Sequence, residues 1–353
     1  MSHILGVPLK NSDKPANAGG HVRVEDVARE AGVSPITVSR ALSSPGKVKA
    51  ETRARVMEAV ARTGYVVNSI ASSLRSGRSS IVTVFVASLQ NPHFATAVQG
   101  ALEAFEGSRF HLMFAQTGYS QPLGAEIVET VKPFRPAGVM FAGVVLGDEA
   151  RAAMRRFGVP VVEVWGEPGK AIDLVAGASI FEATRMMGEH FAAQGYRRVA
   201  YCGQTQLPGG IGLDGFREGY EAGGGWTLAH VQPQEGTGTL ARGIESLDQI
   251  LAAIPDCDAI FFGSDLLAVG ALIRARDRDI DIPGQIAVSG YGDLEFAAHL
   301  NPPLTTLHAS DYETGRLAGQ GLRQRLEGGS VGDPVIQVPM RLVVRASTPQ
   351  KLR

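Results

Sequence analysis

Polar and basic side chains close to the N-terminus have the chemistry needed to read DNA. Thr37, Ser39 and Arg40 lie within four consecutive residues. Threonine and serine hydroxyls can hydrogen-bond phosphates or base edges, and an arginine guanidinium can make two parallel hydrogen bonds to guanine. Ile36 can add apolar contact, for example to a thymine methyl group. Together these residues predict contact with double-stranded DNA.

Two short helices joined by a tight turn would present these side chains together. Apolar residues recur with helical spacing over 24–31, and Gly32 is suited to end that helix. Ser34 is a natural N-cap for a second helix over 35–42, and Pro35 is tolerated at its first position because an N–H there needs no partner. This is the spacing of a helix-turn-helix, whose second helix enters the major groove.

The average charge of the chain conceals an uneven distribution. All 353 residues together carry 34 Lys and Arg against 35 Asp and Glu, and this length predicts two or three domains. The stretch 21–80, with a third helix expected over 50–62, has ten basic and five acidic residues, whereas 81–353 has a net charge of −7. A basic module on an acidic body favours binding to a polyanion, although a plain helical bundle with a basic surface would look similar.

Composition excludes several protein classes. Cys202 and Cys257 are the only cysteines, too few for a disulfide framework or a four-thiolate zinc site. The N-terminal residues do not have the form of a secretory signal, and no apolar run has membrane-spanning length. We therefore expect a cytoplasmic protein without a membrane partner. Residues 1–21, rich in Gly, Asn and Pro, are expected to form a flexible arm.

Beyond residue 80 the pattern changes to alternating strands and helices. Apolar strand-like runs alternate with longer segments of helical periodicity, such as 94–105, 180–194 and 265–276. Such alternation is typical of βαβ units that form parallel sheets covered on both faces. This region is longer than a domain built on one sheet usually is, which favours two α/β lobes with a cleft between them. The predicted fold is a small all-α head followed by a two-lobed α/β body.

Polar and aromatic side chains follow several of the expected strands. Open parallel sheets bind ligands outside the carboxyl ends of their strands, so these are the positions to search for a small-molecule site. Carboxylates, amides and aromatic faces suit a polyol or sugar derivative, which needs hydrogen bonds at its edge and stacking on a ring. The candidate ligand-binding residues are Asn91, His93, Phe94, Glu163, Trp165, Ser264, Asp265 and Asp293.

Two other protein classes fit parts of the sequence. The run 210–215 matches G-x-G-x-x-G, a pattern found in nicotinamide-dependent sugar or polyol dehydrogenases. It lies deep inside the α/β region, and no strand-end acidic residue follows at the usual distance, which argues against an enzyme. A solute-binding carrier without regulatory output is the third class, and the basic head argues against it. We predict no catalytic residue, metal or cofactor.

The predicted helix-turn-helix is similar in detail to a known family. It resembles the head of the LacI family of bacterial transcriptional regulators, and the shared segments are 26–28, 31–34 and 37–42. The resemblance implies a DNA-binding domain over 22–66 and a hinge helix over 67–79, in which Leu74 wedges between base pairs. The DNA-binding residues implied are Ser34, Pro35, Ile36, Thr37, Ser39, Arg40, Lys47, Thr52, Tyr65, Asn68, Ala71 and Leu74.

The body is similar to the sensor domain of the same family, which is related to type I periplasmic binding proteins. The similar segments are 91–92, 282–291 and 302–306. The resemblance implies an effector-binding and dimerisation domain over 80–346, followed by a tail over 347–353. It implies a repressor that binds a pseudo-palindromic operator as a homodimer or higher oligomer, since each recognition helix reads only a few base pairs.

The body departs from many sugar-binding members of that family. Gly212, Ser264 and Gly292 stand where Arg, Asn and Asp are common there. These departures argue against a pyranose site like those of the best-known members. The stretch 163–175 looks more like the gluconate-type branch, which responds to sugar acids. The expected effector is a sugar or a sugar acid such as gluconate, with a neutral sugar or nucleoside as alternatives. No cation cluster for a carboxylate can be identified from the sequence.

Overall fold

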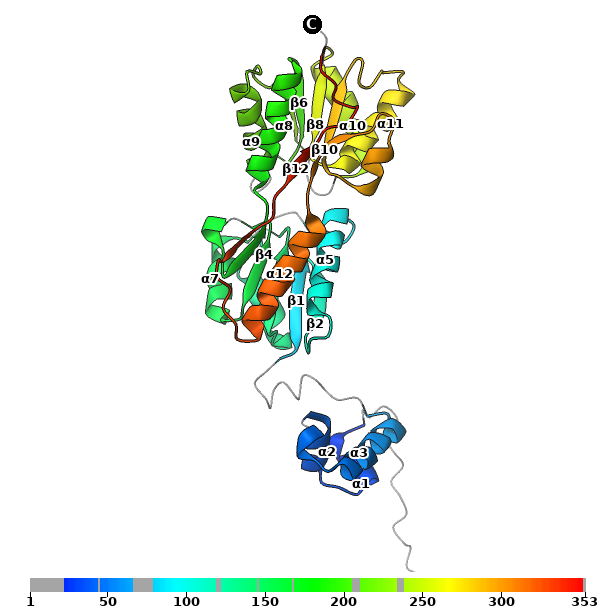
Figure 1. The fold of residues 1–353 in the computed structure, drawn as a ribbon, viewed down its shortest axis with the longest axis vertical. Helices are drawn as coiled ribbons and strands as arrows, with labels where there is room; N and C mark the ends of the chain where they lie inside the picture. Colours follow the sequence, from blue (N-terminus) through cyan, green and yellow to red (C-terminus); the bar gives the residue numbers. More distant parts are fainter. Residues whose placement is uncertain are drawn as a thin grey trace, which may run out of the picture. The chain divides into compact units, whose positions relative to one another are not determined.

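A computed structural model describes most of the chain (Figure 1). The described ranges are 22–43, 45–65, 79–118, 122–144, 146–166, 168–204, 210–233 and 238–351. The chain divides into two compact units, Met1–Gly77 and Arg78–Arg353. The expected arm and nearly all of the expected hinge lie outside the described residues, and so do Asn68, Ala71 and Leu74.

The first unit contains the predicted helical head. Its elements are α1 (Val24–Ala31), α2 (Pro35–Ser43), a 3-10 turn (Pro45–Lys47) and α3 (Ala50–Thr63). Asp26 accepts the N–H of Arg23 at 3.0 Å to begin α1, and Gly32, with φ of 63°, ends it in the left-handed region. The hydroxyl of Ser34 accepts the N–H of Thr37 at 3.2 Å to begin α2. The sequence therefore predicted both helix starts correctly.

Within its described residues, the second unit contains two six-stranded sheets. The first sheet has the order β11-β5-β4-β3-β1-β2, and every neighbouring pair is parallel. Its strands are β1 (Ile81–Val86), β2 (His111–Gln116), β3 (Gly138–Ala142), β4 (Val161–Val164), β5 (Leu174–Gly177) and β11 (Val335–Gln337). The helices of this first lobe are α5 (Pro92–Phe105), α6 (Glu126–Val131), α7 (Asp148–Phe157) and α12 (Asp311–Leu326).

The second sheet has the order β12-β10-β9-β8-β6-β7, and of its described strands only β12 runs antiparallel to the rest. Its strands are β6 (Val199–Gly203), β7 (His230–Pro233), β8 (Ala259–Phe262), β9 (Ala287–Gly292), β10 (Thr305–His308) and β12 (Arg341–Val343). The helices of this second lobe are α8 (Ile180–Gln194), α9 (Gly210–Ala222), α10 (Leu240–Ala253) and α11 (Asp265–Asp277). Short 3-10 turns span Lys132–Phe134, Pro168–Lys170 and Glu295–His299.

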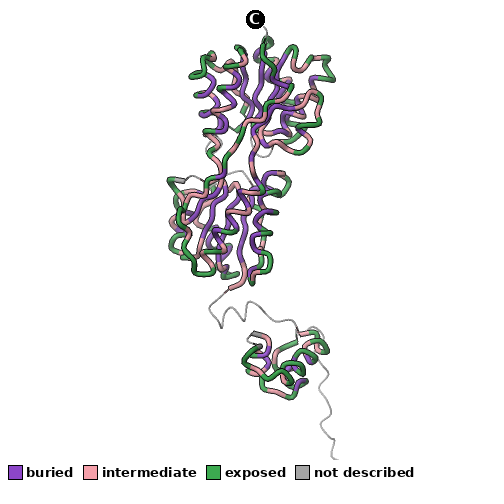
Figure 2. The backbone as a smooth tube through the Cα atoms, in the orientation of Figure 1, coloured by how far each residue is buried: buried purple, intermediate pink, exposed green. Residues whose placement is uncertain are grey.

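The chain passes between the two sheets three times. It crosses from β5 to α8, returns from β10 to α12, and crosses again from β11 to β12 (Figure 1). The central strands of both sheets are buried, while the outer helix faces are exposed (Figure 2). Strands covered on both faces read as continuous apolar runs, which explains why they could be recognised in the sequence. The predicted fold class of a helical head with a two-lobed α/β body is confirmed.

The C-terminal residues belong to the second lobe. Ser347 and Thr348, which the sequence interpretation assigns to a tail, are buried. The hydroxyl of Ser347 donates to the Val288 carbonyl at 2.6 Å and accepts the N–H of Thr305 at 2.8 Å. The described chain therefore remains attached to the second sheet beyond residue 346. Within the described ranges, no helix combines the length and apolar character needed to cross a membrane.

Candidate nucleic-acid interface and effector site

Helix α2 presents the residues predicted to contact DNA on its exposed side. Val38 is fully buried in the head, whereas Ile36 is 64% exposed and Arg40 is exposed. Ser34 and Pro35 are also exposed, and Thr37 and Ser39 are half-buried. An exposed isoleucine beside an arginine is consistent with a surface that becomes covered when the helix enters a groove.

The arginines of the head differ in their partners. Arg29 pairs with Asp26 at 3.2 Å, and Arg62 pairs with Glu30 at 3.0 Å. Arg40 has no ion pair with any residue described in the head, so its guanidinium is available to an external anion or base. Among the other predicted DNA-binding residues, Lys47 is exposed and Thr52 and Tyr65 are half-buried.

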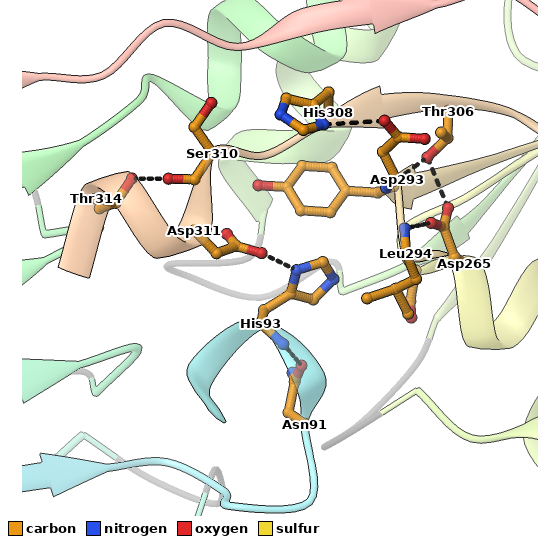
Figure 3. Close-up of polar contacts among 12 residues, drawn as sticks. Asn91, His93, Asp265, Asp293, Leu294, Thr306, His308, Ser310, Asp311 and Thr314 are labelled. Atoms are coloured by element: carbon orange, nitrogen blue, oxygen red, sulfur yellow. Dashed lines mark hydrogen bonds and ion pairs between the residues drawn. The ribbon is translucent and has the colours of Figure 1, made fainter. Parts of the chain in front are cut away.

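His93 is held by two helices of the first lobe. Asn91 caps α5 by accepting the His93 N–H at 3.0 Å. The imidazole Nδ1 lies 2.6 Å from the Asp311 carboxylate at the first residue of α12 (Figure 3). Helices α5 and α12 pack closely because Gly100 and Gly315 each lie against the backbone of the other helix. This packing fixes the position of the imidazole.

The same imidazole reaches the second lobe. Its centroid lies 5.7 Å from that of the Tyr291 ring in an edge arrangement, and the ring lies directly against Gly292. Nδ1 is hydrogen-bonded to the Asp311 carboxylate, but Nε2 is buried and has no hydrogen-bond partner among the described residues. Most buried polar atoms have a partner, so an Nε2 without one makes this junction a candidate ligand site.

The surroundings of His93 favour its charged form. Burial by itself lowers the pKa, because a low dielectric disfavours the imidazolium. The hydrogen bond to Asp311, the negative charges of Asp311 and Asp265, and the nearby backbone of Tyr291 outweigh burial and raise the pKa of His93 above its ordinary 6.5. The junction between the lobes therefore favours the protonated imidazole more than water does.

Asp265 positions the loop that follows β9. Its carboxylate accepts the Thr306 hydroxyl at 2.6 Å and the Leu294 N–H at 2.8 Å (Figure 3), and burial raises the pKa of Asp265 above its ordinary range. Its neighbour Ser264 caps α11 by accepting the N–H of Leu266 at 3.2 Å. Both predicted residues therefore organise this edge of the second lobe.

Asp293 lies in the same loop and is held by Arg345 and His308. Arg345 approaches its carboxylate at 2.6 Å and Nδ1 of His308 at 2.9 Å. Burial alone would raise the pKa of Asp293, but the hydrogen bonds from Arg345 and His308 lower it below the ordinary range. Asp293 also has a φ of 56°, a left-handed conformation that is uncommon outside glycine and clusters at functional sites.

Phe94 and Trp165 form an aromatic wall on the first lobe. Their ring centroids are 5.5 Å apart and tilted by 48°. Gly143 lies directly against the Phe94 ring, and Gly177 lies against the Trp165 ring, which would be 2.9 Å from a Cβ atom at position 177. A side chain at either glycine would displace the ring beside it. Trp165 has a φ of 60°, a second left-handed residue among the predicted set. A wall of this kind can stack on the apolar face of a sugar.

Glu163 occupies a different environment from the other predicted residues. Its carboxylate is buried and pairs with Arg151 of α7 at 2.7 Å, and it also accepts the N–H of Ile172 at 2.9 Å. Arg151 in turn donates to the Lys170 carbonyl at 2.7 Å. These contacts tie α7 to the segment after β4, so the Glu163 carboxylate holds the first lobe together.

We name the interlobe cluster as His93, Asp311, Tyr291, Gly292, Asp265 and Asp293. The sequence identified three of its six members as candidate site residues. Asp311 was missed because the short strand β10 was not recognised, and Asp311 follows that strand by three residues. The segment containing Tyr291 and Gly292 was recognised as a strand end. The His93 ring that contacts both residues lies on the other lobe, so this contact could not be predicted from the sequence.

Two glycines of the G-x-G-x-x-G run, Gly212 and Gly215, serve helix packing. Gly215 lies in α9, and a side chain there would meet the Phe181 carbonyl and the Thr184 hydroxyl of α8. Gly212 faces the same helix, within van der Waals reach of Ile180 and Thr184. Their small size therefore permits the close approach of α9 to α8, which accounts for the pattern without a dinucleotide.

Both parts of the chain match known families. Residues 23–68 match the family described as bacterial regulatory proteins of the lacI family, and residues 189–348 match the periplasmic binding protein-like domain. The chain is 31% identical over 348 residues to the HTH-type transcriptional regulator GntR of Pseudomonas aeruginosa, covering 96% of this chain and 99% of the relative.

Solved structures agree with this result. A LacI-family transcriptional regulator from Silicibacter pomeroyi has a TM-score of 0.83 at 31% identity, over 94% of this chain and all of that one. The transcriptional regulator CelR in complex with cellobiose has a TM-score of 0.66 at 26% identity, over 92% and 99% of the two chains. These matches extend over nearly the whole chain and agree with its helical head and two lobes. This chain belongs to the LacI family of DNA-binding bacterial transcriptional regulators.

Proposed function

We propose that this protein is a cytoplasmic homodimeric repressor whose affinity for a pseudo-palindromic operator is controlled by a sugar acid bound between its lobes. The observation that carries the effector class is the buried His93 imidazole, whose Nε2 has no partner among the described residues. A charged donor in a buried site makes a strong hydrogen bond to a carboxylate. His93, already a candidate ligand-binding residue in the sequence, would supply the cation for which the sequence offered no cluster.

The rest of the interlobe region suits a polyol chain. The half-buried Trp165 ring lies beside the buried Phe94, while Asn91 and Ser264 contribute polar side chains at the carboxyl ends of strands. CelR, a relative with this fold, was solved with the sugar cellobiose. The relatives are transcriptional regulators, so the dehydrogenase alternative is set aside.

The effector would act by changing the relation between the lobes. The β10–α12 crossover connects the second lobe to Asp311 within three residues, so movement of one lobe is transmitted to the base of α12. In an allosteric regulator, a coupling of about 1–3 kcal/mol between two sites changes affinity by roughly 5- to 150-fold. We expect induction, in which the bound acid lowers operator affinity.

A thermal-shift comparison tests the effector class. The full-length protein is heated with D-gluconate, with D-glucose or with a purine nucleoside at equal concentrations. A ligand at 100 times its dissociation constant stabilises a protein by about 2.7 kcal/mol, so gluconate should raise the melting temperature clearly. A shift with glucose or the nucleoside and none with gluconate would show that the effector is neutral.

The charge on His93 predicts a pH dependence. Because its pKa is raised in the folded protein, the imidazolium predominates below about pH 6.5 and is lost as the pH rises through the raised value. Gluconate affinity should therefore fall as the pH is raised from 6.5 to 9, measured by isothermal titration calorimetry. His93→Gln should weaken binding by about tenfold at pH 6.5 and abolish the pH dependence.

His111→Gln is the matched control for this experiment. His111 is exposed on β2, away from the interlobe cluster, so its replacement should leave both affinity and pH profile unchanged. A pH profile that persists in His93→Gln would assign the titration to another group and remove the main support for an acidic effector.

A further inference from the structure

Gly292 is the residue of the second lobe that lies against His93. It ends β9 with a φ of 131°, a backbone conformation that L side chains rarely adopt. A Cβ atom built on Gly292 would overlap the imidazole at Cε1 and Nε2. The close fit therefore depends on the absence of a side chain at this position.

The imidazole has little freedom to move away from a larger residue. Its Nδ1 is tied to Asp311 at 2.6 Å, and its backbone N–H is tied to Asn91 at 3.0 Å. Tyr291 lies beside it, 5.7 Å away between ring centroids. A methyl group at position 292 must therefore either separate the lobes or turn the ring, and both changes displace Nε2.

We propose that Gly292 is a positioning residue that sets the preference of the effector site for an anion. By leaving room for the His93 ring between the lobes, it places a protonated nitrogen where the ligand is received. This inference rests on the proposed function, since it assumes that His93 meets the acid group of the effector. Gly292 acts through His93 and makes no contact of its own with the acid group.

Gly292→Ala provides the test. D-gluconate and D-glucose are titrated into the full-length protein at pH 6.5 and pH 8.5 by calorimetry. We expect Gly292→Ala to lose at least about tenfold in gluconate affinity, which corresponds to one displaced charge-assisted hydrogen bond, and to lose most of the pH dependence. Any weak affinity for glucose should change less, because glucose carries no acid group.

Gly328→Ala controls for backbone strain. Gly328 has a φ of 85°, but the space around its ideal Cβ position is open within 4 Å. The variant Gly328→Ala therefore reproduces the conformational strain of alanine in the left-handed region without touching His93. Both variants should melt cooperatively and bind operator DNA in the absence of effector, and only Gly292→Ala should lose gluconate affinity.

A double-mutant cycle separates positioning from general damage. In a His93→Ala background no ring remains to be displaced, so adding Gly292→Ala should change gluconate affinity by less than about twofold. A similar tenfold loss in both backgrounds would overturn the inference, and so would wild-type affinity in Gly292→Ala. If the wild-type protein itself does not bind gluconate, the proposed effector class fails first and this inference with it.

Discussion

Operator affinity should fall by about 5- to 150-fold when Arg40 is replaced by alanine. Arg40 is exposed on α2 and has no ion pair with a described residue of the head, so its guanidinium is available to guanine. A bidentate contact of this type contributes about 1–3 kcal/mol of discrimination. The loss should be measured by fluorescence anisotropy at fixed salt, with a duplex selected by the full-length protein from a random pool.

Arg29→Ala is the matched control, because it removes the same charge from the same head. Arg29 pairs with Asp26 on α1 and lies outside the predicted recognition helix. Its loss should weaken binding only slightly. The salt dependence distinguishes the kind of contact, since loss of a phosphate contact reduces the slope of log affinity against log salt by about one, whereas loss of a base contact does not. Equal losses in the two variants would reject Arg40 as a base-reading residue.

The body should lose about 3–5 kcal/mol of unfolding free energy when Arg151 is replaced by alanine. Arg151 and Glu163 are both buried and lie 2.7 Å apart, so removing one partner leaves an uncompensated charge inside the first lobe. Urea unfolding followed by circular dichroism measures this loss. Replacing the pair together, as Arg151→Met with Glu163→Leu, should recover most of the stability, because no buried charge is then left unpaired.

A conservative variant, Glu163→Gln, decides between two roles for Glu163. If it holds the first lobe together, Glu163→Gln destabilises the body and leaves gluconate affinity nearly unchanged in the folded protein. If it binds the effector, as the sequence suggests, Glu163→Gln weakens gluconate binding with little change in stability. The contacts to Arg151 and Ile172 favour the first outcome.

Local patterns explain why the head was predictable from its sequence. Its helix starts depend on contacts between residues three apart, such as Arg23 with Asp26 and Ser34 with Thr37. Its exposed and buried faces follow from helical periodicity, which places Val38 inside and Ile36 outside. Because these interactions join residues that are close together in the chain, they can be recognised from the sequence alone.

The interlobe cluster was only partly predictable, because its members come from distant parts of the chain. Strand ends indicated His93, Asp265 and Asp293, since the carboxyl ends of parallel strands meet at one edge of a sheet. The partner of His93 lies 218 residues away, beyond a four-residue strand whose pattern is too short to stand out. Glu163 also lies at a strand end, yet its carboxylate already pairs with Arg151 and accepts the N–H of Ile172.

The sequence by itself determined that this chain is a DNA-reading head joined to a two-lobed sensor, because periodicity, capping residues and strand–helix alternation are local properties. Only the tertiary structure decided which polar groups are satisfied and which are left available. Asp311 engages one nitrogen of His93 while the other lacks a partner among the described residues, and Gly292 makes room for the ring. Such an outcome depends on strand order and lobe packing, which bring together residues that no sequence spacing connects.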